Sequence, residues 1–271
     1  MTEEVVITEP FVVSSVEGAV GWLTLNEPRR LNPVNADRIL ELNAAAEAMS
    51  ARDDVAVVVI TGAGRAFCAG ADVAAPRYAR PARPDPHRRP APPASNSVSP
   101  GHPGLWTLTS VRQPVIAMLN GAAVGYGFEL ALQADIRLAG ESARLGAPFP
   151  QLGTVTDTGA ATWLLPRLVG WSRAAEILYS GRLLTAGEAA AIGLVNSVHP
   201  ADELRAATEQ LAADIAAGSA WSLRTMKRML LDGLAESPRE HVMTQWFHYN
   251  TGDPGHDRQV YLDRVRSRRR D

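Results

Sequence analysis

Alternation of hydrophobic and polar residues opens the chain and predicts a β-hairpin. Phe11–Val16 and Val20–Leu25 alternate in strand fashion on either side of Glu17-Gly18, a pair that favours a tight turn. Further along, Val55–Ile60 is apolar without interruption, which is typical of a strand whose two faces are both covered. The first quarter of the chain therefore predicts a hairpin followed by a buried strand.

Helical spacing lies between the hairpin and that strand. Within residues 35–49 a side-chain oxygen of Asn35 or Asp37 can cap a helix, and apolar residues recur at helical spacing at Ile39, Leu40, Leu42, Ala46 and Met49. A strand, a loop and a helix recur in that order within Pro114–Leu132, and Ala134–Ala139 adds a short strand. The pattern predicts an α/β fold.

The last part of the chain is helical by pattern. Residues 202–217, 222–234 and 236–249 show helical spacing and are separated by glycines. Their apolar side chains exceed what three short helices bury among themselves, which favours packing on the core or on another subunit. We therefore divide the chain into a core, residues 1–200, and a C-terminal helical oligomerisation region, residues 201–271.

One stretch of the core interrupts these patterns. Nine of the chain's 19 prolines fall between Pro76 and Pro103, among several arginines, and no helix survives that density of proline. We interpret residues 76–104 as a mobile surface insertion. A substrate flap, whose arginines meet an anionic ligand, is the alternative.

Composition excludes several classes of protein. With 27 basic and 29 acidic residues and a net charge of −2, the chain lacks the basic face of a nucleic-acid binder. Its acidic start is unlike a signal peptide, and its most apolar long window carries polar residues, so we expect a soluble, cytoplasmic protein that does not enter membranes. Cys68 is the only cysteine, which predicts a small buried thiol, and the six histidines form no metal-binding pattern.

Two glycine-rich stretches carry the candidate chemistry. Gly64–Asp72 (GRAFCAGAD) and Asn120–Leu130 (NGAAVGYGFEL) each follow a run of β-branched apolar residues. Glycine lets the backbone approach a ligand, and a backbone N–H at a strand end or helix start can point at negative charge that develops on a carbonyl oxygen. Two such loops predict one oxyanion-binding site fed by both segments, with plain turn formation as the alternative.

Three stretches resemble the enoyl-CoA hydratase/isomerase (crotonase) family. They are VAVVVITGAGRAFCAGADV, the segment from QPVIAMLNGAAVGYGFEL to WLLPRLVG, and EILYSGRLLTAGEAAAIGLVNSVHP, in the family's order and at about its spacing. The likeness covers most of residues 11–200. It implies a crotonase-like spiral of repeated β-β-α units with a C-terminal helical trimerisation region. It also implies an acyl-CoA thioester substrate and a homotrimer or a dimer of trimers.

The resemblance also implies the substrate site. The backbone N–H groups of Ala71 and Tyr126 form the oxyanion hole for the thioester carbonyl. Tyr126 stands where many members have glycine, and so it adds a ring near the pocket. Coenzyme A arrives as part of the substrate, and no further cofactor or metal is implied. The residues implied to border the substrate are Arg30, Leu31, Ala69, Gly70, Asp72, Gly125 and Phe149.

The acid and base groups follow from the same resemblance. Glu129 occupies the position of the family's first catalytic glutamate, with a solvated carboxylate in the first helical turn as the alternative. The second glutamate is missing, because its G-x-P-E stretch is replaced by Gly146–Phe149. Asp157 is the natural second acid or base, with a helix cap as the alternative. We expect the protein to hydrate or isomerise an enoyl-CoA.

Two other functions are weighed against this one. A nucleotide-binding oxidoreductase would need G-x-G-x-x-G after the strand at 55–60, but Phe67 stands at the third glycine. A catalytically silent acyl-CoA-binding homologue, which keeps the loops and has lost the chemistry, is suggested by Phe149 in place of glutamate.

Overall fold

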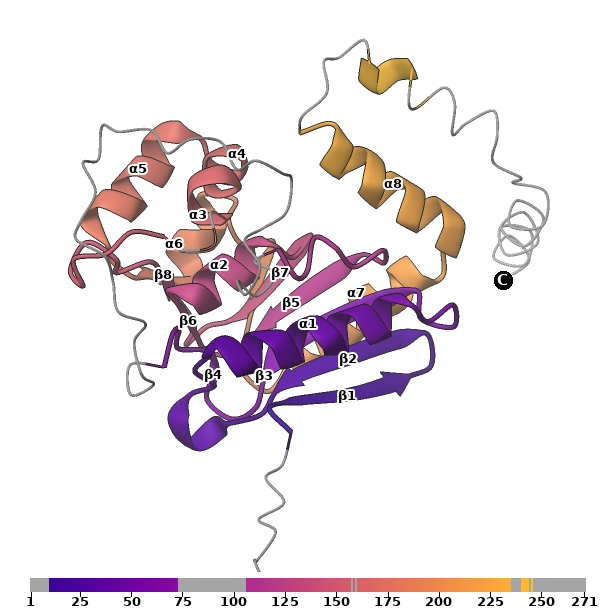
Figure 1. The fold of residues 1–271 in the computed structure, drawn as a ribbon, viewed down its shortest axis with the longest axis horizontal. Coiled ribbons are helices and arrows are strands. Elements are labelled where there is room, and N and C mark those ends of the chain that lie inside the picture. Colours follow the sequence, from indigo (N-terminus) through magenta and orange to yellow (C-terminus); the bar gives the residue numbers. More distant parts are fainter. Residues whose placement is uncertain are drawn as a thin grey trace, which may run out of the picture.

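The computed structural model of the chain describes residues 10–72, 106–156, 158, 160–234, 240–243 and 245. The proline-rich insertion at 76–104 and the C-terminal residues 246–271 lie outside this part of the chain. Within it, two β-sheets form the centre of the fold and helices pack around them (Figure 1).

The larger sheet has six strands in the order β1-β2-β3-β5-β7-β10. β1 and β2 are antiparallel, and each further neighbouring pair is parallel. The predicted hairpin and the predicted strands near 55, 115 and 136 are confirmed. The strands are β1 (Val12–Glu17), β2 (Val20–Leu25), β3 (Val57–Gly62), β5 (Val115–Leu119), β7 (Ile136–Gly140) and β10 (Ser197–His199).

The smaller sheet lies where strands β3, β5 and β7 of the larger sheet end. Its strands run in the order β4-β6-β8-β9: β4 (Ala66–Cys68), β6 (Ala122–Val124), β8 (Arg144–Gly146) and β9 (Leu184–Thr185). The chain passes repeatedly from the large sheet to the small one, because β3 leads to β4, β5 to β6 and β7 to β8. The later turns end in helices α2 (Tyr126–Leu132) and α3 (Ala160–Trp163). This arrangement confirms the predicted spiral of β-β-α units.

Helices bury both faces of the large sheet. Because side chains alternate along a strand, Val58 and Ile60 of β3 join the core cluster that includes helix α1 (Ala36–Ser50). Val57 points to the other face and joins the cluster that includes helix α7 (Leu204–Ala216). This double coverage explains why the sequence of β3 is apolar without interruption.

Helix starts follow local sequence signals. At α1, the side-chain oxygen of Asn35 accepts the N–H of Arg38 (2.9 Å), so Asn35 is the cap, and Asp37 lies in the first turn. At α6, Thr185 and Glu188 form a capping box. The remaining short helices are η1 (Pro28–Arg30), α4 (Leu165–Val169), α5 (Trp171–Ser180) and α6 (Ala186–Ala191).

Helix α8 (Ala220–Asp232) stands at the margin of the sheets and is tied to them by a buried lysine (Figure 1). The ammonium group of Lys227 contacts the carboxylate of Asp135 (2.9 Å) and the carbonyl oxygens of Leu108 (3.2 Å) and Gln113 (3.0 Å). Burial lowers the pKa of Lys227 despite that carboxylate. The outward side chains of α8 that are exposed include Trp221, Met226 and Leu230.

The other predictions for the C-terminal region have mixed outcomes. The helices expected at 202–217 and 222–234 are confirmed by α7 and α8. Of the helix expected at 236–249, residues 240–243 and 245 are helical, and the others lie outside the described part. Across the residues that the structure describes, no helix is both long and apolar enough to cross a membrane.

Candidate active site

The two glycine-rich loops meet because the strands before them are neighbours. β4 and β6 pair in parallel, with Ala66 opposite Ala122, so the loops that follow leave the same edge of the small sheet. Gly70 and Gly125 both have positive φ angles, +103° and +56°. A Cβ atom on Gly70 would lie 2.8 Å from the carbonyl oxygen of Val124. Only glycine allows the two backbones to approach so closely.

The predicted oxyanion donors, the backbone N–H groups of Ala71 and Tyr126, both lie at this junction. The N–H of Val34 donates to Gly70, and the N–H of Asp72 donates to Val34 (2.9 and 2.6 Å). Ala71, which forms a parallel bridge with Val34, therefore directs its own N–H away from that strand. Tyr126 is the first residue of α2, where a backbone N–H lies outside the helix's own hydrogen-bond ladder.

The segments implied to border coenzyme A also come together. The N–H of Ala69 donates to the carbonyl of Leu31 (2.9 Å), which places the two loops side by side. The guanidinium group of Arg30 pairs with the carboxylate of Asp72 (2.6 Å), and that contact raises the pKa of Arg30. Arg30 is exposed while Asp72 is largely covered, so the pair presents its positive member to solvent.

Two asparagines brace the glycine-rich loops, and neither was assigned a role from the sequence. Asn32 is fully buried, and its side-chain N–H groups donate to the carbonyl oxygens of Ala66 (2.8 Å) and Phe67 (3.2 Å). The side-chain N–H groups of Asn120 donate to the carbonyl oxygens of Gly62 and Gly64, both at 2.8 Å. The sequence signal for this role is an asparagine near a glycine-rich turn, because its side-chain amide can both donate to and accept from backbone groups.

Glu129 lies in the first turn of α2, fully buried. Its carboxylate oxygens accept the N–H of Ala161 (3.1 Å) and the N–H of Thr158 (3.4 Å) at the start of α3. The alternative of a solvated carboxylate is therefore wrong. Asp157, the residue before Thr158 in the sequence, lies outside the described residues, so its two predicted roles stay predictions.

Aromatic rings occupy the two positions where the chain departs from the family pattern. Tyr126 and Phe149 are 3% and 9% exposed, and both pack in the main core cluster. The N–H of Gly125 donates to the carbonyl of Gly146 (2.9 Å), which ties the second glycine-rich loop to the strand that precedes Phe149. The position of the missing glutamate is thus apolar and nearly closed to water.

Thiol and metal chemistry receive no support from the described residues. Cys68 is fully buried, as predicted, and burial raises the pKa of its thiol to about 12. In the ranges that the structure describes, no group of three or more histidine, cysteine, aspartate or glutamate side chains is arranged to hold a metal ion.

Comparison with known proteins places this chain in a family. The enoyl-CoA hydratase/isomerase family profile matches residues 15–248. The Bacillus subtilis protein YngF, named as an enoyl-CoA hydratase/isomerase, is 34% identical over 92% of each chain. The 1,2-epoxyphenylacetyl-CoA isomerase of Escherichia coli is 35% identical over 81% of each chain. The crystal structure of enoyl-CoA hydratase from Bacillus anthracis has a TM-score of 0.81 and 28% identity, over 95% of this chain and 96% of that one.

The family profile covers most of the chain, and the solved structure shares its fold over nearly the whole length. These similarities agree with the motifs GRAFCAGAD and NGAAVGYGFEL, which lie on the two loops that meet at Gly70 and Gly125. The chain belongs to the enoyl-CoA hydratase/isomerase family and has the crotonase fold.

Proposed function

We propose that this protein isomerises or hydrates an enoyl-CoA by stabilising a thioester enolate between its two glycine-rich loops. One observation carries the proposal. The loops that contain Gly70 and Gly125 touch, and one helical turn beyond them lies the buried carboxylate of Glu129. An acyl-CoA has a carbonyl oxygen that the two loops can bind and an acidic C–H group from which Glu129 can take a proton.

The loops would act on the carbonyl oxygen. It accepts hydrogen bonds from the backbone N–H groups of Ala71 and Tyr126, and these bonds strengthen as negative charge moves onto the oxygen. Loss of one such donor typically lowers the rate by about 100- to 1,000-fold. The buried surroundings favour this effect, because a hydrogen bond to charge is stronger where water is excluded.

Glu129 would move the proton. In isomerisation it takes a proton from C2 of a 3-enoyl-CoA, which leaves a dienolate held by the loops, and returns that proton to C4 to give the 2-enoyl-CoA. One carboxylate is enough for this transfer. The N–H groups of Ala161 and Thr158 hold the carboxylate in a fixed orientation.

Isomerisation is the better supported of the two reactions. Hydration needs one group to activate water and a second to protonate C2, and Phe149 stands where the family's second glutamate would do so. Asp157 would take that second role if the chain hydrates its substrate. The relative from Escherichia coli is named as an isomerase of a CoA thioester, which agrees with this preference.

The competing function is binding of an acyl-CoA without catalysis, and Phe149 in place of the second glutamate favours it. In either case we propose that the chain works as a homotrimer or a dimer of trimers, since α8 exposes apolar side chains that another copy would bury. A cytoplasmic location stays a prediction from the sequence.

The decisive experiment measures turnover of 2-enoyl- and 3-enoyl-CoA substrates by the wild type, Glu129→Gln and Asp157→Asn, with acyl-CoA binding and thermal unfolding measured in parallel. We expect Glu129→Gln to bind normally and to lose about 100- to 10,000-fold in kcat. Glu141→Gln, an exposed substitution of the same kind, is the matched control. Normal binding without turnover by the wild type would favour the silent binder. Absence of binding would exclude both functions.

A further inference from the structure

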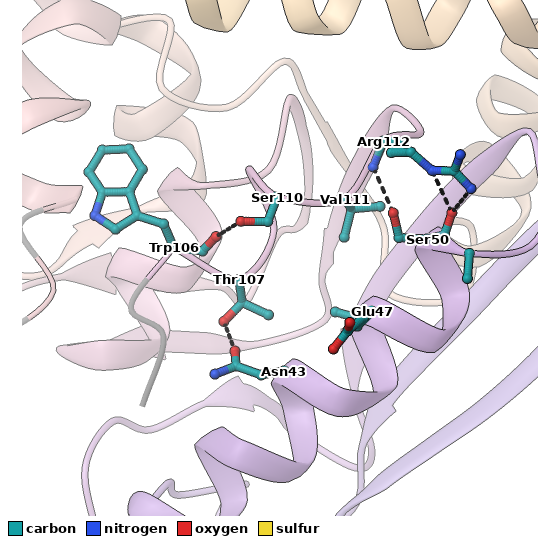
Figure 2. Close-up of a pocket in the computed structure, with 10 residues that line it drawn as sticks. Asn43, Glu47, Ser50, Trp106, Thr107, Ser110, Val111 and Arg112 are labelled. Carbon is teal, nitrogen blue, oxygen red and sulfur yellow. Dashed lines mark hydrogen bonds between the residues drawn. The ribbon is translucent and has the colours of Figure 1, made fainter. Parts of the chain in front are cut away.

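A cavity of about 770 Å³ lies between helix α1 and the segment 106–112 (Figure 2). Its volume is within the range of small-molecule sites, roughly 300–1,000 Å³. Small side chains form much of its wall, including Ala46 of α1, Ala51 directly after that helix, and Val111 of the segment 106–112. Nothing in the proposed chemistry uses this cavity.

Several polar groups of the wall bond to neighbouring residues, and the exposed Glu47 also lines the cavity. The hydroxyl of Thr107 donates to the side chain of Asn43. Two N–H groups of the Arg112 guanidinium donate to the carbonyl oxygen of Ser50, at 2.6 and 3.0 Å. Figure 2 shows these two pairs on different parts of the wall. An aliphatic chain would therefore lie along the apolar part of the wall, at Ala46 and Val111, and away from Glu47.

Trp106 connects the cavity to Glu129. Trp106 lines one end of the cavity (Figure 2) and packs against the main core cluster. Its indole N–H donates to the carbonyl oxygen of Thr158 (3.2 Å), and the N–H of Thr158 donates to the carboxylate of Glu129 (3.4 Å). Thr158 and Glu129 are both buried. The order in space is therefore carboxylate, Thr158, indole and cavity.

The geometry points to Trp106 as the residue that sets acyl-chain length, by closing the substrate site off from this cavity. This inference rests on the proposed function, because it takes the reacting carbon to lie at Glu129. An acyl group that passes Glu129 meets the indole, which its bond to Thr158 holds in place. The wild type then prefers short acyl chains, and removal of the ring joins the cavity to the site.

The test compares kcat/KM for enoyl-CoA substrates of four to twelve acyl carbons. Trp106→Ala raises kcat/KM for the long chains relative to the short ones by about tenfold or more, because methylenes enter an apolar cavity. Trp106→Leu, which keeps apolar contact with the core, gives a smaller change of the same sign and carries the test if the alanine variant does not fold. Trp171→Ala, at an exposed tryptophan of α5, is the matched control and leaves the profile unchanged.

A second substitution tests whether the cavity takes the chain. Ala51 directly follows α1, is exposed and lines the cavity, so Ala51→Phe narrows the cavity from a position outside the core. Added to Trp106→Ala, it should reduce the gain, most of all for the longest chains. The inference is overturned if folded, active Trp106 variants keep the wild-type profile, or if Ala51→Phe leaves the gain for the longest chains undiminished. If the wild type neither binds nor converts any acyl-CoA, the proposed function fails and this inference fails with it.

Discussion

At the scale of single residues, the site depends on side chains that hold backbone in place. Asn32 has a positive φ of 56°. Its side chain joins two segments of the chain, because its oxygen accepts the N–H of Glu27 (2.8 Å) and its N–H groups donate to the carbonyl oxygens of Ala63, Ala66 and Phe67. Asparagine tolerates the left-handed region better than most residues. One buried amide thus fixes the turn that leads into the first glycine-rich loop.

Asn32→Asp tests this role with a change of almost no volume. The carboxylate keeps the acceptor for Glu27 but replaces the donor with an oxygen that faces buried carbonyls. We expect the free energy of unfolding to fall by about 2–4 kcal/mol, since each buried polar group left without a partner costs about 1–3 kcal/mol. Unfolding in urea measures this change in the free energy of unfolding. Asn35→Asp, where the side chain only accepts at a helix start, should change stability little; equal losses in both variants would contradict the account.

At the scale of elements, short strands and helices set the geometry of the site. β4 and β6 are three residues each, yet their parallel pairing brings Gly70 beside Gly125. Helix α2 places Tyr126 at its first position and Glu129 one turn later, and α3 supplies the N–H that the carboxylate accepts. Each element is too short to be stable alone, so packing between them fixes the arrangement.

Helix α8 carries the prediction at this scale. Leu230 is 73% exposed on α8, and the buried Lys227 fixes the orientation of the helix. Leu230→Glu should reduce the mass measured by light scattering from that of a trimer, or of two trimers, toward that of one chain, while the far-ultraviolet dichroism stays unchanged. Leu40→Glu, at an exposed leucine of α1, is the matched control. A wild type that is already monomeric would contradict the proposed assembly.

At the scale of the whole molecule, the spiral brings together residues that lie far apart in the sequence. Loops near residues 30, 70 and 125 form one junction, and Glu129 meets α3 beyond it. The glycine-rich loops could be predicted from the sequence, because glycine after a buried strand has a local signature. The bracing by Asn32 and the bond between Trp106 and Thr158 could not, since both depend on contacts between segments distant in sequence.

The small sheet also escaped prediction, for a physical reason. Strands of two or three residues, such as Ala122–Val124, are too short to show a period, and they exist only because neighbouring turns of the spiral pair them. Glu129 was predicted as a site residue, but its burial was not. The two backbone donors that hold it lie at Thr158 and Ala161, about thirty residues later in the chain.

The vibrational spectrum of a bound acyl-CoA tests the central claim most directly. An isotope-labelled thioester carbonyl should absorb at lower frequency when bound than in water, because the N–H groups of Ala71 and Tyr126 polarise it. Gly70→Ala, whose Cβ would lie 2.8 Å from the carbonyl oxygen of Val124, should weaken that shift and lower kcat together. A carbonyl band that does not move when acyl-CoA binds to the wild type would contradict the oxyanion hole and the mechanism built on it.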